Sequence, residues 1–430
     1  MAQSLAVIVL AAGLGTRTKV SIPKVLLPLC GRTMLGTVLH TVAELSPERT
    51  IVVLHHGKQQ VEEHLAAMDP AITANLVTVD QGEPRGTGHA VQTALPALGD
   101  FDGDVLVVYG DVPLIRAETL QALRDARKDG VASILTSFDD PPEGMGRILR
   151  DGDGDLLGVR EQKDCNDDEL AIEEFNAGFY CFDGGWLPGA LKSLTPKNAQ
   201  GELYLTDTVG WLLSQGKKVS SVSSDTSEEV AGVNSLADLV FVRQILHERI
   251  LMEHLENGVI IEDPATTFID QGVTIGADTR IFPCTMIRTG VKIANGCEVG
   301  PFAHLRNGSE MQEGSQLGNF VEAKNTFVGK GTKAKHLTYL GDTTIGEKAN
   351  IGAGTITANY DGKNKHKTVI GDGAFVGSGT VLVAPTELGA KSMTGAGAIV
   401  MRNTTIAAGE VFVGIPARLL RKKENAKDPA

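Results

Sequence analysis

The sequence lacks an excess of basic residues, and it lacks any apolar run long enough to cross a bilayer. Lys and Arg total 40 against 53 Asp and Glu, which leaves a formal net charge of −13 at pH 7. Because an acidic surface repels nucleic acid, we expect no nucleic acid as the main partner, although local Lys and Arg can still bind small anions. The short apolar runs also predict no membrane partner.

The cysteines show neither a CxxC pair nor the spacing of a disulfide framework. The five are Cys30, Cys165, Cys181, Cys284 and Cys297. We therefore expect reduced thiols and a cytoplasmic location. The apolar segment 5–12 has no basic residues before it and is only about as long as a core strand. We interpret it as a strand and not as a signal segment.

Residues 1–232 alternate short apolar runs with helical patterns, which predicts a first domain of α/β type. The predicted strands are 5–10, 50–54, 76–79 and 105–109, and the predicted helices are 34–45, 59–68, 89–95 and 117–128. Such alternation is typical of a parallel, doubly wound, Rossmann-like sheet. Residues 233–257 are predicted as an amphipathic linker helix.

From residue 258 to residue 418, aliphatic side chains recur at every sixth position. The first of them are Ile269, Ile275, Ile281, Ile287, Ile293, Val299, Leu305, Met311 and Leu317. A period of six is one flat side of a triangular coil, and three sides make one turn of a parallel β-helix of hexapeptide repeats. The pattern breaks at 320–327 and 357–369, where we expect ligand-binding loops. Residues 419–430 are predicted as a loose tail.

Two glycines and two basic residues follow the first predicted strand. Gly13 and Gly15 would let backbone N–H groups approach a phosphate, and Arg17 and Lys24 would supply positive charge. The spacing is neither that of a Walker A loop nor that of the dinucleotide-binding fingerprint. By itself this turn predicts only an anion site.

Several later segments of the first domain combine glycines with amide and carboxylate side chains. They are Gln81 with Gly86-Thr87-Gly88-His89, Tyr109-Gly110-Asp111-Val112-Pro113-Leu114, Gly146-Arg147, Glu161, Asn176-Ala177-Gly178 and Gly232-Val233-Asn234. With the first turn, they resemble the signature of the sugar-nucleotide pyrophosphorylases, which join a sugar 1-phosphate to a nucleoside triphosphate. The resemblance implies a set of nucleotide- and sugar-binding positions. These are Leu10, Gly13, Lys24, Gln81, Gly86, Thr87, Tyr109, Gly146, Glu161, Asn176 and Asn234.

The same resemblance assigns Mg²⁺ to Asp111 and Asn234, and catalytic roles to Arg17 and Lys24. In the implied reaction the sugar phosphate attacks the α-phosphorus of UTP and pyrophosphate leaves, so positive charge must hold two anions together. The plainer alternatives are a strand-end turn for Asp111 and a helix N-cap for Asn234. Residues 82–85 depart from the family pattern. This departure leaves open a related pyrophosphorylase with another base or sugar.

The second domain carries four polar segments among its repeats. They are Gly318-Asn319-Phe320-Val321-Glu322-Ala323-Lys324, Lys335-His336-Leu337-Thr338-Tyr339-Leu340-Gly341-Asp342, Asn350-Ile351-Gly352-Ala353-Gly354-Thr355 and Asn359-Tyr360-Asp361-Gly362. These resemble the acetyltransferase half of the bifunctional N-acetylglucosamine-1-phosphate uridyltransferase/glucosamine-1-phosphate N-acetyltransferase family. The resemblance covers nearly the whole chain. It implies a left-handed β-helix, acetyl-CoA as co-substrate, and a homotrimer with active sites between neighbouring helices.

His336 is the general base that this resemblance implies. An imidazole near its unperturbed pKa is suited to take a proton from the amine of glucosamine 1-phosphate. The resemblance also implies which residues contact the substrates. The sugar phosphate is assigned to Arg306, Lys324 and Lys365, and the sugar ring to Tyr339, Asn350 and Tyr360. Asn359 is assigned to the sugar or the thioester oxygen, and acetyl-CoA to Ser378 and Ala396. The spacing of His304, His336 and His366 matches no zinc ligand set, so we expect no zinc.

Two departures keep a second hypothesis open. The hexads before Gly318 are fewer than the family usually has, and Gly414 stands where the family places an Arg near the coenzyme A phosphates. Arg418, Arg421 and Lys422 are the candidates to replace that Arg. The alternative function is a uridylyltransferase whose β-helix serves only as a trimerisation scaffold.

Overall fold

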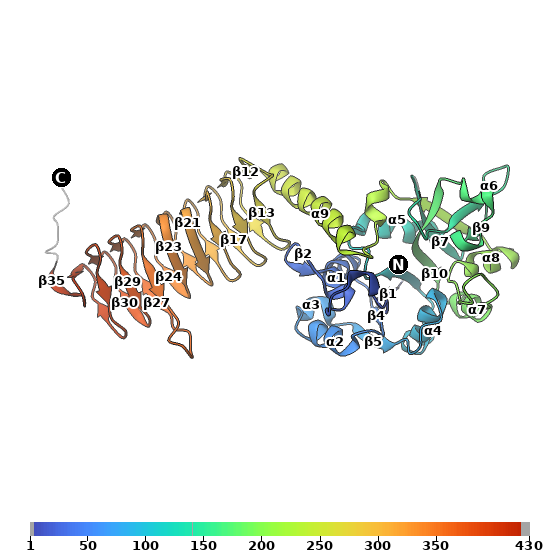
Figure 1. Cartoon of the computed structure of the whole chain (residues 1–430), viewed down its shortest axis with the longest axis horizontal. Helices are drawn as coiled ribbons and strands as arrows, with labels where there is room; N and C mark the ends of the chain where they lie inside the picture. The colour runs from blue at the N-terminus through green and yellow to red at the C-terminus, as the bar shows by residue number, and fades with distance from the viewer. Residues whose placement is uncertain (1–3, 140, 423–430) are drawn as a thin grey trace. The chain divides into compact units, whose positions relative to one another are not determined.

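The computed structural model describes residues 4–139 and 141–422, and the chain divides into two compact units, Met1–Gln244 and Ile245–Ala430. The first is an α/β unit and the second is a β-helix (Figure 1). The division falls within the predicted linker helix, which is α9 (Leu236–Glu256). Among the described residues, no helix combines the length and the apolar character that crossing a membrane requires.

The first unit is built on a nine-stranded sheet whose main path has the order β11-β7-β10-β6-β1-β4-β5. These strands are β1 (Leu5–Leu10), β4 (Arg49–Leu54), β5 (Leu76–Asp80), β6 (Asp104–Tyr109), β7 (Ala132–Phe138), β10 (Glu174–Asp183) and β11 (Val219–Ser223). β1 pairs in parallel with β4 and β6, and β4 pairs in parallel with β5. The four predicted strands therefore form, with the predicted direction.

One strand departs from the predicted parallel order. β10 runs antiparallel to both β6 and β7. It follows the hairpin of β8 (Arg147–Arg150) and β9 (Leu156–Arg160), and β8 also pairs antiparallel with β10. A hairpin reverses the chain without a helical crossover, and apolar runs alone do not reveal strand direction.

Helices cover both faces of this sheet, as a doubly wound fold requires. Successive residues of β1 point to opposite faces. Its odd-numbered residues join a core cluster with α1, α2 and α5, and its even-numbered residues join a second with α4, α7 and α8. These helices are α1 (Met34–Glu44), α2 (Lys58–Ala66), α4 (Thr87–Leu98), α5 (Ala117–Arg127), α7 (Leu187–Lys192) and α8 (Asp207–Ser214). Shorter elements are β2 (Pro28–Leu29), β3 (Arg32–Thr33), α3 (Pro70–Thr73), α6 (Asp167–Leu170), η1 (Thr16–Thr18), η2 (Lys24–Leu26), η3 (Gln162–Asp164) and η4 (Ser227–Val230).

The second unit stacks short parallel strands into a β-helix, as the hexads predict (Figure 1). Its first strands are β12 (Ile260–Ile261), β13 (Phe268–Ile269), β14 (Thr274–Ile275), β15 (Arg280–Ile281), β16 (Met286–Ile287), β17 (Lys292–Ile293), β18 (Glu298–Val299), β19 (His304–Leu305) and β20 (Glu310–Met311). β12 pairs with β15, and β15 pairs with β18, so three strands make one coil. The predicted aliphatic residues from Ile269 to Leu317 lie inside, each at most 9% exposed.

The later coils are less regular. Their strands are β21 (Gln316–Lys324), β22 (Phe327–Val328), β23 (Lys333–Gly341), β24 (Thr343–Ile345), β25 (Asn350–Ile351), β26 (Ile356–Ala358), β27 (Thr368–Ile370), β28 (Phe375–Val376), β29 (Val381–Val383), β30 (Thr386–Leu388), β31 (Met393–Thr394), β32 (Ile399–Val400), β33 (Thr405–Ile406), β34 (Glu410–Val413) and β35 (Arg418–Lys422). The loop expected at 320–327 is wrong, because β21 and β23 continue side by side around a corner. Val299 pairs with Leu317, but Leu317 pairs with Ala334, so this coil is one residue shorter and no loop arises.

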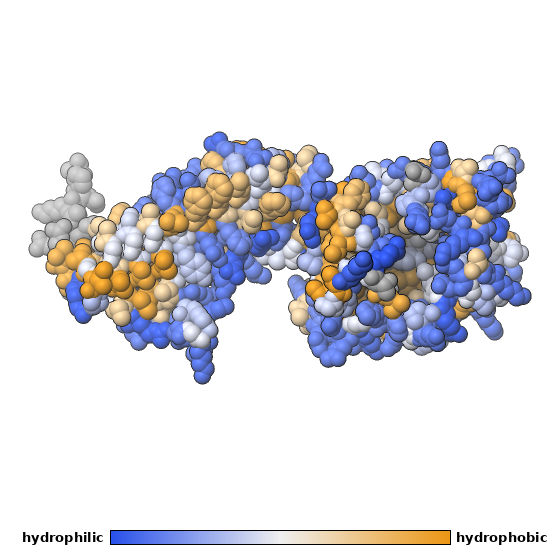
Figure 2. All heavy atoms as spheres, viewed as in Figure 1, coloured by the Kyte–Doolittle hydropathy of each residue, from blue (hydrophilic) through white to orange (hydrophobic). Residues whose placement is uncertain are grey.

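The expected loop at 357–369 lies between β26 and β27, where Tyr360 bridges to Lys365. The predicted tail, 419–430, begins inside β35, which pairs antiparallel with β34, and residues 423–430 lie outside the described residues. Figure 2 shows apolar residues over this end of the β-helix. The large exposed ones are Met401, Ile415, Leu419 and Leu420.

Candidate active sites

A cavity of ≈ 270 Å³ opens where β1 and β6 end in the first unit. The last residues of these strands, Leu10 and Tyr109, pair in register. The cavity is lined by Leu10, Ala12, Gly13, Leu14, Gln81, Pro84, Gly86, Thr87, Ala90, Tyr109, Asp111 and Glu202. Most of the nucleotide positions predicted from the sequence, and one predicted metal ligand, therefore meet at the carboxyl edge of the sheet, where ligands of open α/β sheets bind.

Glycine shapes the turn after β1. Gly15 has φ +61°, and a Cβ atom there would lie 2.9 Å from Cβ of Lys24, closer than real Cβ contacts. A larger residue at this position would be strained and would push Lys24 away. Thr18 closes the turn by donating its hydroxyl to the carbonyl oxygen of Gly15 at 2.7 Å.

Lys24 contacts both predicted metal ligands. Its ammonium donates to Oδ2 of Asp111 at 2.5 Å and to Oδ1 of Asn234 at 3.3 Å. The Lys24 side chain is 8% exposed. Asp111 and Asn234 are far apart in sequence, and the backbone N–H of Val233 donates to the carbonyl oxygen of Asp111 at 2.9 Å. This bond holds the two predicted ligands side by side.

Asp238 fixes the backbone next to Asn234. Its carboxylate accepts from the N–H groups of Asn234 and Ser235, each at 2.8 Å, and Oγ of Ser235 accepts from the N–H of Asp238 at 3.2 Å. Ser235 thus provides the capping side chain that the alternative hypothesis gave to Asn234. Burial opposes ionisation of Asp238, but these hydrogen bonds and the charge of the exposed Arg17 outweigh it, and the pKa of Asp238 lies below its usual value.

The segment after Gln81 is held against a later loop. Gly86 has φ +104°, and a Cβ atom there would lie 2.6 Å from the carbonyl oxygen of Leu203. The N–H of Leu205 donates to Oγ1 of Thr87 at 3.1 Å. The buried Gln81 donates from Nε2 to the carbonyl oxygen of Gly86 at 3.2 Å. The segment that resembles a base-reading element is therefore a preformed wall of the cavity.

Glu161 lines a second cavity of ≈ 350 Å³, together with Tyr204 and Thr206. The hydroxyl of Thr206 donates to Oε1 of Glu161 at 2.9 Å. Burial raises the pKa of Glu161, and neighbouring carboxylates, Asp207 first among them, add to the shift while Thr206 opposes it. Burial also raises the pKa of Tyr109, with help from the negative charge of Glu161.

Gly146 lies beside Asn176, a residue of β10. The N–H of Asn176 donates to the carbonyl oxygen of Gly146 at 2.8 Å. The Asn176 amide donates from Nδ2 to the hydroxyl of Tyr180 at 2.8 Å, and its Oδ1 accepts from the N–H of Gly178 at 3.1 Å. The orientation of this buried amide is therefore set by the protein.

In the second unit, the three predicted phosphate-binding residues gather at one corner of the β-helix. Lys365 lies against Lys324 and lowers its pKa, together with burial and the charge of Arg306, while Asp342 opposes the shift. Arg306 donates from Nη1 to Oε1 of Glu322 at 2.8 Å. Three cations against two carboxylates give this corner a net positive charge, which is suited to an anion.

Asp342 orders the same corner. Its Oδ1 accepts from Nδ2 of Asn325 at 2.7 Å, and its Oδ2 accepts from Nδ2 of Asn359 at 2.5 Å. Burial opposes ionisation of Asp342, but the two amides and the charges of Lys324 and Lys365 hold its pKa below the usual value. The amide of Asn359, a predicted substrate contact, is thereby oriented.

The predicted base and the predicted acetyl-CoA residues form a row at the neighbouring corner. Ala334, Ile351 and Val376 pair on successive coils, so the residues two positions further along also stack. The stacked residues are His336, Ala353, Ser378 and, from the pairing of the next coil, Ala396. His336 is exposed. The residues that follow it in the row are small, and Ser378 and Ala396 are exposed.

One flat side separates the two corners within a chain. Tyr339 lies on β23 between His336 and Asp342, and six residues of extended chain span at most about 20 Å. Asn350 lies on another side, where it pairs with Lys333 and Phe375. Tyr360 lies in the exposed loop after β26, and its hydroxyl donates to the carbonyl oxygen of Gly362 at 2.5 Å.

Comparison with known proteins decides the family. Residues 7–149 match the family described as MobA-like NTP transferase domain. The chain is 39% identical to the bifunctional protein GlmU of Thermobifida fusca, over 99% of this chain and 95% of that protein. It is 41% identical to GlmU of Neisseria meningitidis serogroup C, over 93% of each. The chain belongs to the GlmU family.

The similarity to GlmU proteins extends across both units. GlmU of Desulfitobacterium hafniense is 40% identical over 93% of this chain and 94% of that protein. A solved structure of UDP-glucose pyrophosphorylase complexed with UDP-glucose is more distant, with a TM-score of 0.48, 15% identity, and coverage of 58% of this chain and 100% of that one.

Sequence reasoning did not assign several residues that the GlmU fold places at these sites. In the first unit they are Glu202, Tyr204 and Thr206, which follow an irregular stretch with no motif of its own. In the second unit they are Glu322 and Asp342, whose partners lie on neighbouring coils. Glu322 and Asp342 could have been found by aligning the hexads of successive coils, because residues one coil apart stack.

Proposed function

We propose that the chain acetylates glucosamine 1-phosphate with acetyl-CoA and then transfers UMP from UTP to the product, N-acetylglucosamine 1-phosphate. The final products are UDP-N-acetylglucosamine and pyrophosphate. The observation that carries the proposal is the presence of two separate candidate sites, a cavity at the sheet edge with Lys24 against one of its lining residues, and a cluster of three cations at a β-helix corner. Membership of a family of bifunctional proteins supports two activities in one chain.

Asp111 and Asn234 suit a Mg²⁺ ion. A carboxylate oxygen and an amide oxygen already converge on one cation, the ammonium of Lys24. Mg²⁺ prefers few protein oxygens and keeps water or phosphate oxygens for the rest of its shell. When bound, the ion neutralises charge on the triphosphate.

The residues of the first unit would position the two phosphates. An oxygen of the sugar phosphate attacks the α-phosphorus of UTP, the bond to the β-phosphate oxygen breaks, and pyrophosphate leaves. Arg17 and Lys24 would hold the triphosphate and the transferring group from the turn after β1. Gln81, behind Gly86, would contact the base, and Glu161 and Asn176 would orient the sugar.

His336 would act as the general base of acetyl transfer. It takes a proton from the acceptor amine, whose nitrogen attacks the thioester carbonyl carbon. The C–N bond forms, the C–S bond breaks, and the coenzyme A thiolate leaves and takes up a proton. The corner with Arg306, Lys324 and Lys365 would bind the sugar phosphate. The row of small residues that contains Ser378 and Ala396 would bind acetyl-CoA.

A homotrimer would complete the acetyltransferase site. The cationic corner and the His336 row lie one flat side apart in a single chain, so a second copy would bring one corner against the other. An exposed apolar ridge beside His336 supports this arrangement. The rings of Phe302 and Phe320 stack with their centroids 5.0 Å apart, and Leu337 follows on the next coil.

The free cysteines support a cytoplasmic location.

The experiment is to supply the purified full-length protein with glucosamine 1-phosphate, acetyl-CoA and a nucleoside triphosphate, and to follow products by mass spectrometry. With UTP, we expect N-acetylglucosamine 1-phosphate to rise first and UDP-N-acetylglucosamine to follow. ATP, GTP and dTTP are the matched alternatives, and efficient transfer from one of them in place of UTP would overturn the assigned base. No acetylated product under any condition would overturn the acetyltransferase.

One observation favours uridylylation alone as a second candidate function. Gly414, at the position where the resembled family has an Arg, lies in the tight turn between β34 and β35. Arg418 pairs across this turn with Val413 and donates from Nη1 to the carbonyl oxygen of Ala417 at 3.1 Å. If this end of the chain binds acetyl-CoA, Arg418→Ala should lower the affinity for acetyl-CoA. An unchanged affinity would mean that Arg418 does not replace the missing Arg.

A further inference from the structure

We propose that the Lys24 ammonium and a divalent cation compete for the same two oxygens, so that metal binding displaces Lys24 and frees it for the triphosphate. The proposal rests on the metal site in the proposed function. It adds that Lys24 has two successive partners, the ligands Asp111 and Asn234 and then a phosphate. Lys24 would thereby couple the binding of metal to the binding of UTP.

The contacts of Lys24 place its charge where a metal would lie. Its Nζ is 2.5 Å from Oδ2 of Asp111 and 3.3 Å from Oδ1 of Asn234. A metal bound by the same two oxygens would lie within a few ångströms of that nitrogen. Two cations at such a distance beside a single carboxylate repel each other strongly. Only one of them can hold these oxygens at a time.

The backbone at Lys24 is fixed, so displacement has to be a swing of the side chain. Lys24 begins η2, whose turn is closed by the N–H of Leu26 on the carbonyl oxygen of Pro23 at 2.8 Å. The side chain then runs under the glycine turn, and a Cβ atom at Gly13 would lie 4.0 Å from its Cε. Gly13 also lines the nucleotide cavity. A small rotation of the four-carbon stem therefore carries the ammonium from Asp111 toward the place expected for the phosphates.

This exchange makes metal and nucleotide binding cooperative. A triphosphate offers the displaced ammonium a new anionic partner, so UTP lowers the cost of breaking the contact with Asp111. By thermodynamic reciprocity, UTP then strengthens metal binding by the same factor as the metal strengthens UTP binding.

The first test measures metal affinity without turnover. Mn²⁺ alone is titrated into the full-length protein, and free Mn²⁺ is followed by electron paramagnetic resonance. Lys24→Met removes the competing ammonium, and we expect it to bind Mn²⁺ about tenfold more tightly than the unaltered protein, the size of one charged hydrogen bond. The matched control, Lys128→Met, removes an exposed cation that pairs with Asp125 at the surface. It should stay within about twofold.

The second test detects the displacement itself. An amine-selective acylating reagent is applied briefly to the unaltered protein with and without Mg²⁺, and labelling of each lysine is read by mass spectrometry. We expect Mg²⁺ to increase labelling of Lys24 several-fold and leave Lys128 unchanged. UTP added with Mg²⁺ should protect Lys24 again. Labelling of Lys24 that does not respond to Mg²⁺ would overturn the exchange.

Asp111→Asn separates failure of this proposal from failure of the proposed metal site. If Asp111→Asn binds Mn²⁺ as tightly as the unaltered protein, the metal binds elsewhere and both ideas are wrong. If Asp111→Asn loses binding but Lys24→Met matches the unaltered protein, the metal site stands and the competition is refuted.

Discussion

At the scale of single residues, Glu161 is a proposed substrate contact whose burial lowers the stability of the fold. Burial raises its pKa, so the folded state binds the proton more tightly than the unfolded state. The ionised form therefore destabilises the fold once the pH exceeds the usual range of a glutamate, and this destabilisation grows as the pH rises through the raised pKa. Below the usual range both states are protonated and the effect disappears.

The prediction is that Glu161→Gln is more stable than the unaltered protein at neutral pH, and that the difference shrinks as the pH falls. Both tryptophans, Trp186 and Trp211, lie in the first unit, so urea unfolding followed by their fluorescence reports on this unit. The KM for N-acetylglucosamine 1-phosphate should rise about tenfold, because a charged hydrogen bond is lost.

The control for Glu161 is Glu63→Gln, an exposed change on α2, which should alter neither stability nor KM. A stability difference that is independent of pH, or a Glu161→Gln protein that is less stable at every pH, would contradict the account of Glu161.

At the scale of elements, the corner around Asp342 links three coils through Asn325 and Asn359. Asp342→Ala should free the Asn359 amide and leave Lys324 and Lys365 without their nearest carboxylate. We expect the KM for glucosamine 1-phosphate to rise about tenfold, the size of one charged hydrogen bond, while uridylylation is unchanged. Steady-state assays of both reactions measure this split.

Asp372 is the matched control for Asp342. It lies at another corner, where its Oδ1 accepts from the N–H of Glu347 at 2.8 Å, so Asp372→Ala removes a carboxylate away from the cationic cluster. If both substitutions raise the KM for glucosamine 1-phosphate equally, Asp342 only stabilises the β-helix and does not position the side chains of the cationic corner.

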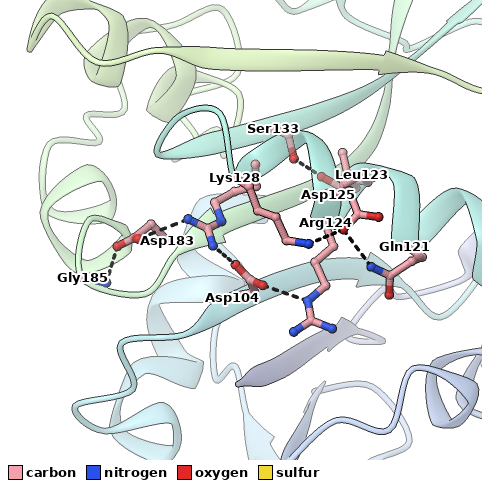
Figure 3. A network of polar contacts seen from close by, with 10 residues as sticks. Asp104, Gln121, Leu123, Arg124, Asp125, Lys128, Ser133, Asp183 and Gly185 are labelled. Carbon is pink, nitrogen blue, oxygen red and sulfur yellow. Dashed lines mark hydrogen bonds and ion pairs between the residues drawn. The ribbon is translucent and has the colours of Figure 1, made fainter. Parts of the chain in front are cut away.

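A buried ion network ties α5 to the sheet (Figure 3). Asp104, at the start of β6 and 0% exposed, pairs with Arg124 at 2.8 Å and with Arg127, which also reaches Asp183 at 3.5 Å. Asp104→Ala would leave two cations near the core with one carboxylate lost, and we expect it to reduce the unfolding free energy of the first unit by about 3–5 kcal/mol.

Asp125 is the control for Asp104, because it pairs with Lys128 at the surface (Figure 3). Asp125→Ala should cost less than about 1 kcal/mol. The unfolding free energy of both variants is measured by tryptophan fluorescence during urea unfolding. Equal effects of the two substitutions would show that burial of Asp104 does not decide its importance.

At the scale of the whole molecule, the sequence predicts the elements well where one physical rule governs them. Each hexad aliphatic residue must point inward, so the period of six predicts the β-helix from residue 269 onward. β1 is buried along its whole length and appears as a continuous apolar run. The direction of β10 was missed because it depends on the preceding hairpin, and no local pattern encodes that.

The candidate sites are predicted less completely, because side chains far apart in sequence converge only through register and loops. The sequence predicts Asp111, Asn234 and Lys24 as site residues but not the contact of the Lys24 ammonium with the other two. It supplied His336 and Lys324 but not their separation on neighbouring corners, which follows from how β21 and β23 turn. Tyr204 and Thr206 were missed because their loop carries no periodic signal.

The account's central claim is that one chain holds two independent sites, and complementation between two inactive variants tests it most directly. In His336→Ala the acetylation rate should fall by at least about 100-fold and the uridylylation rate should be unchanged, because only the proposed general base is removed. Arg17→Ala should do the reverse, because it loses charge at the transferring phosphoryl group. The measurement is formation of UDP-N-acetylglucosamine from glucosamine 1-phosphate, acetyl-CoA and UTP. Neither variant alone should form it at an appreciable rate, whereas their mixture should, as N-acetylglucosamine 1-phosphate diffuses from one to the other. A mixture as inactive as its components, with both proteins folded, would contradict the claim.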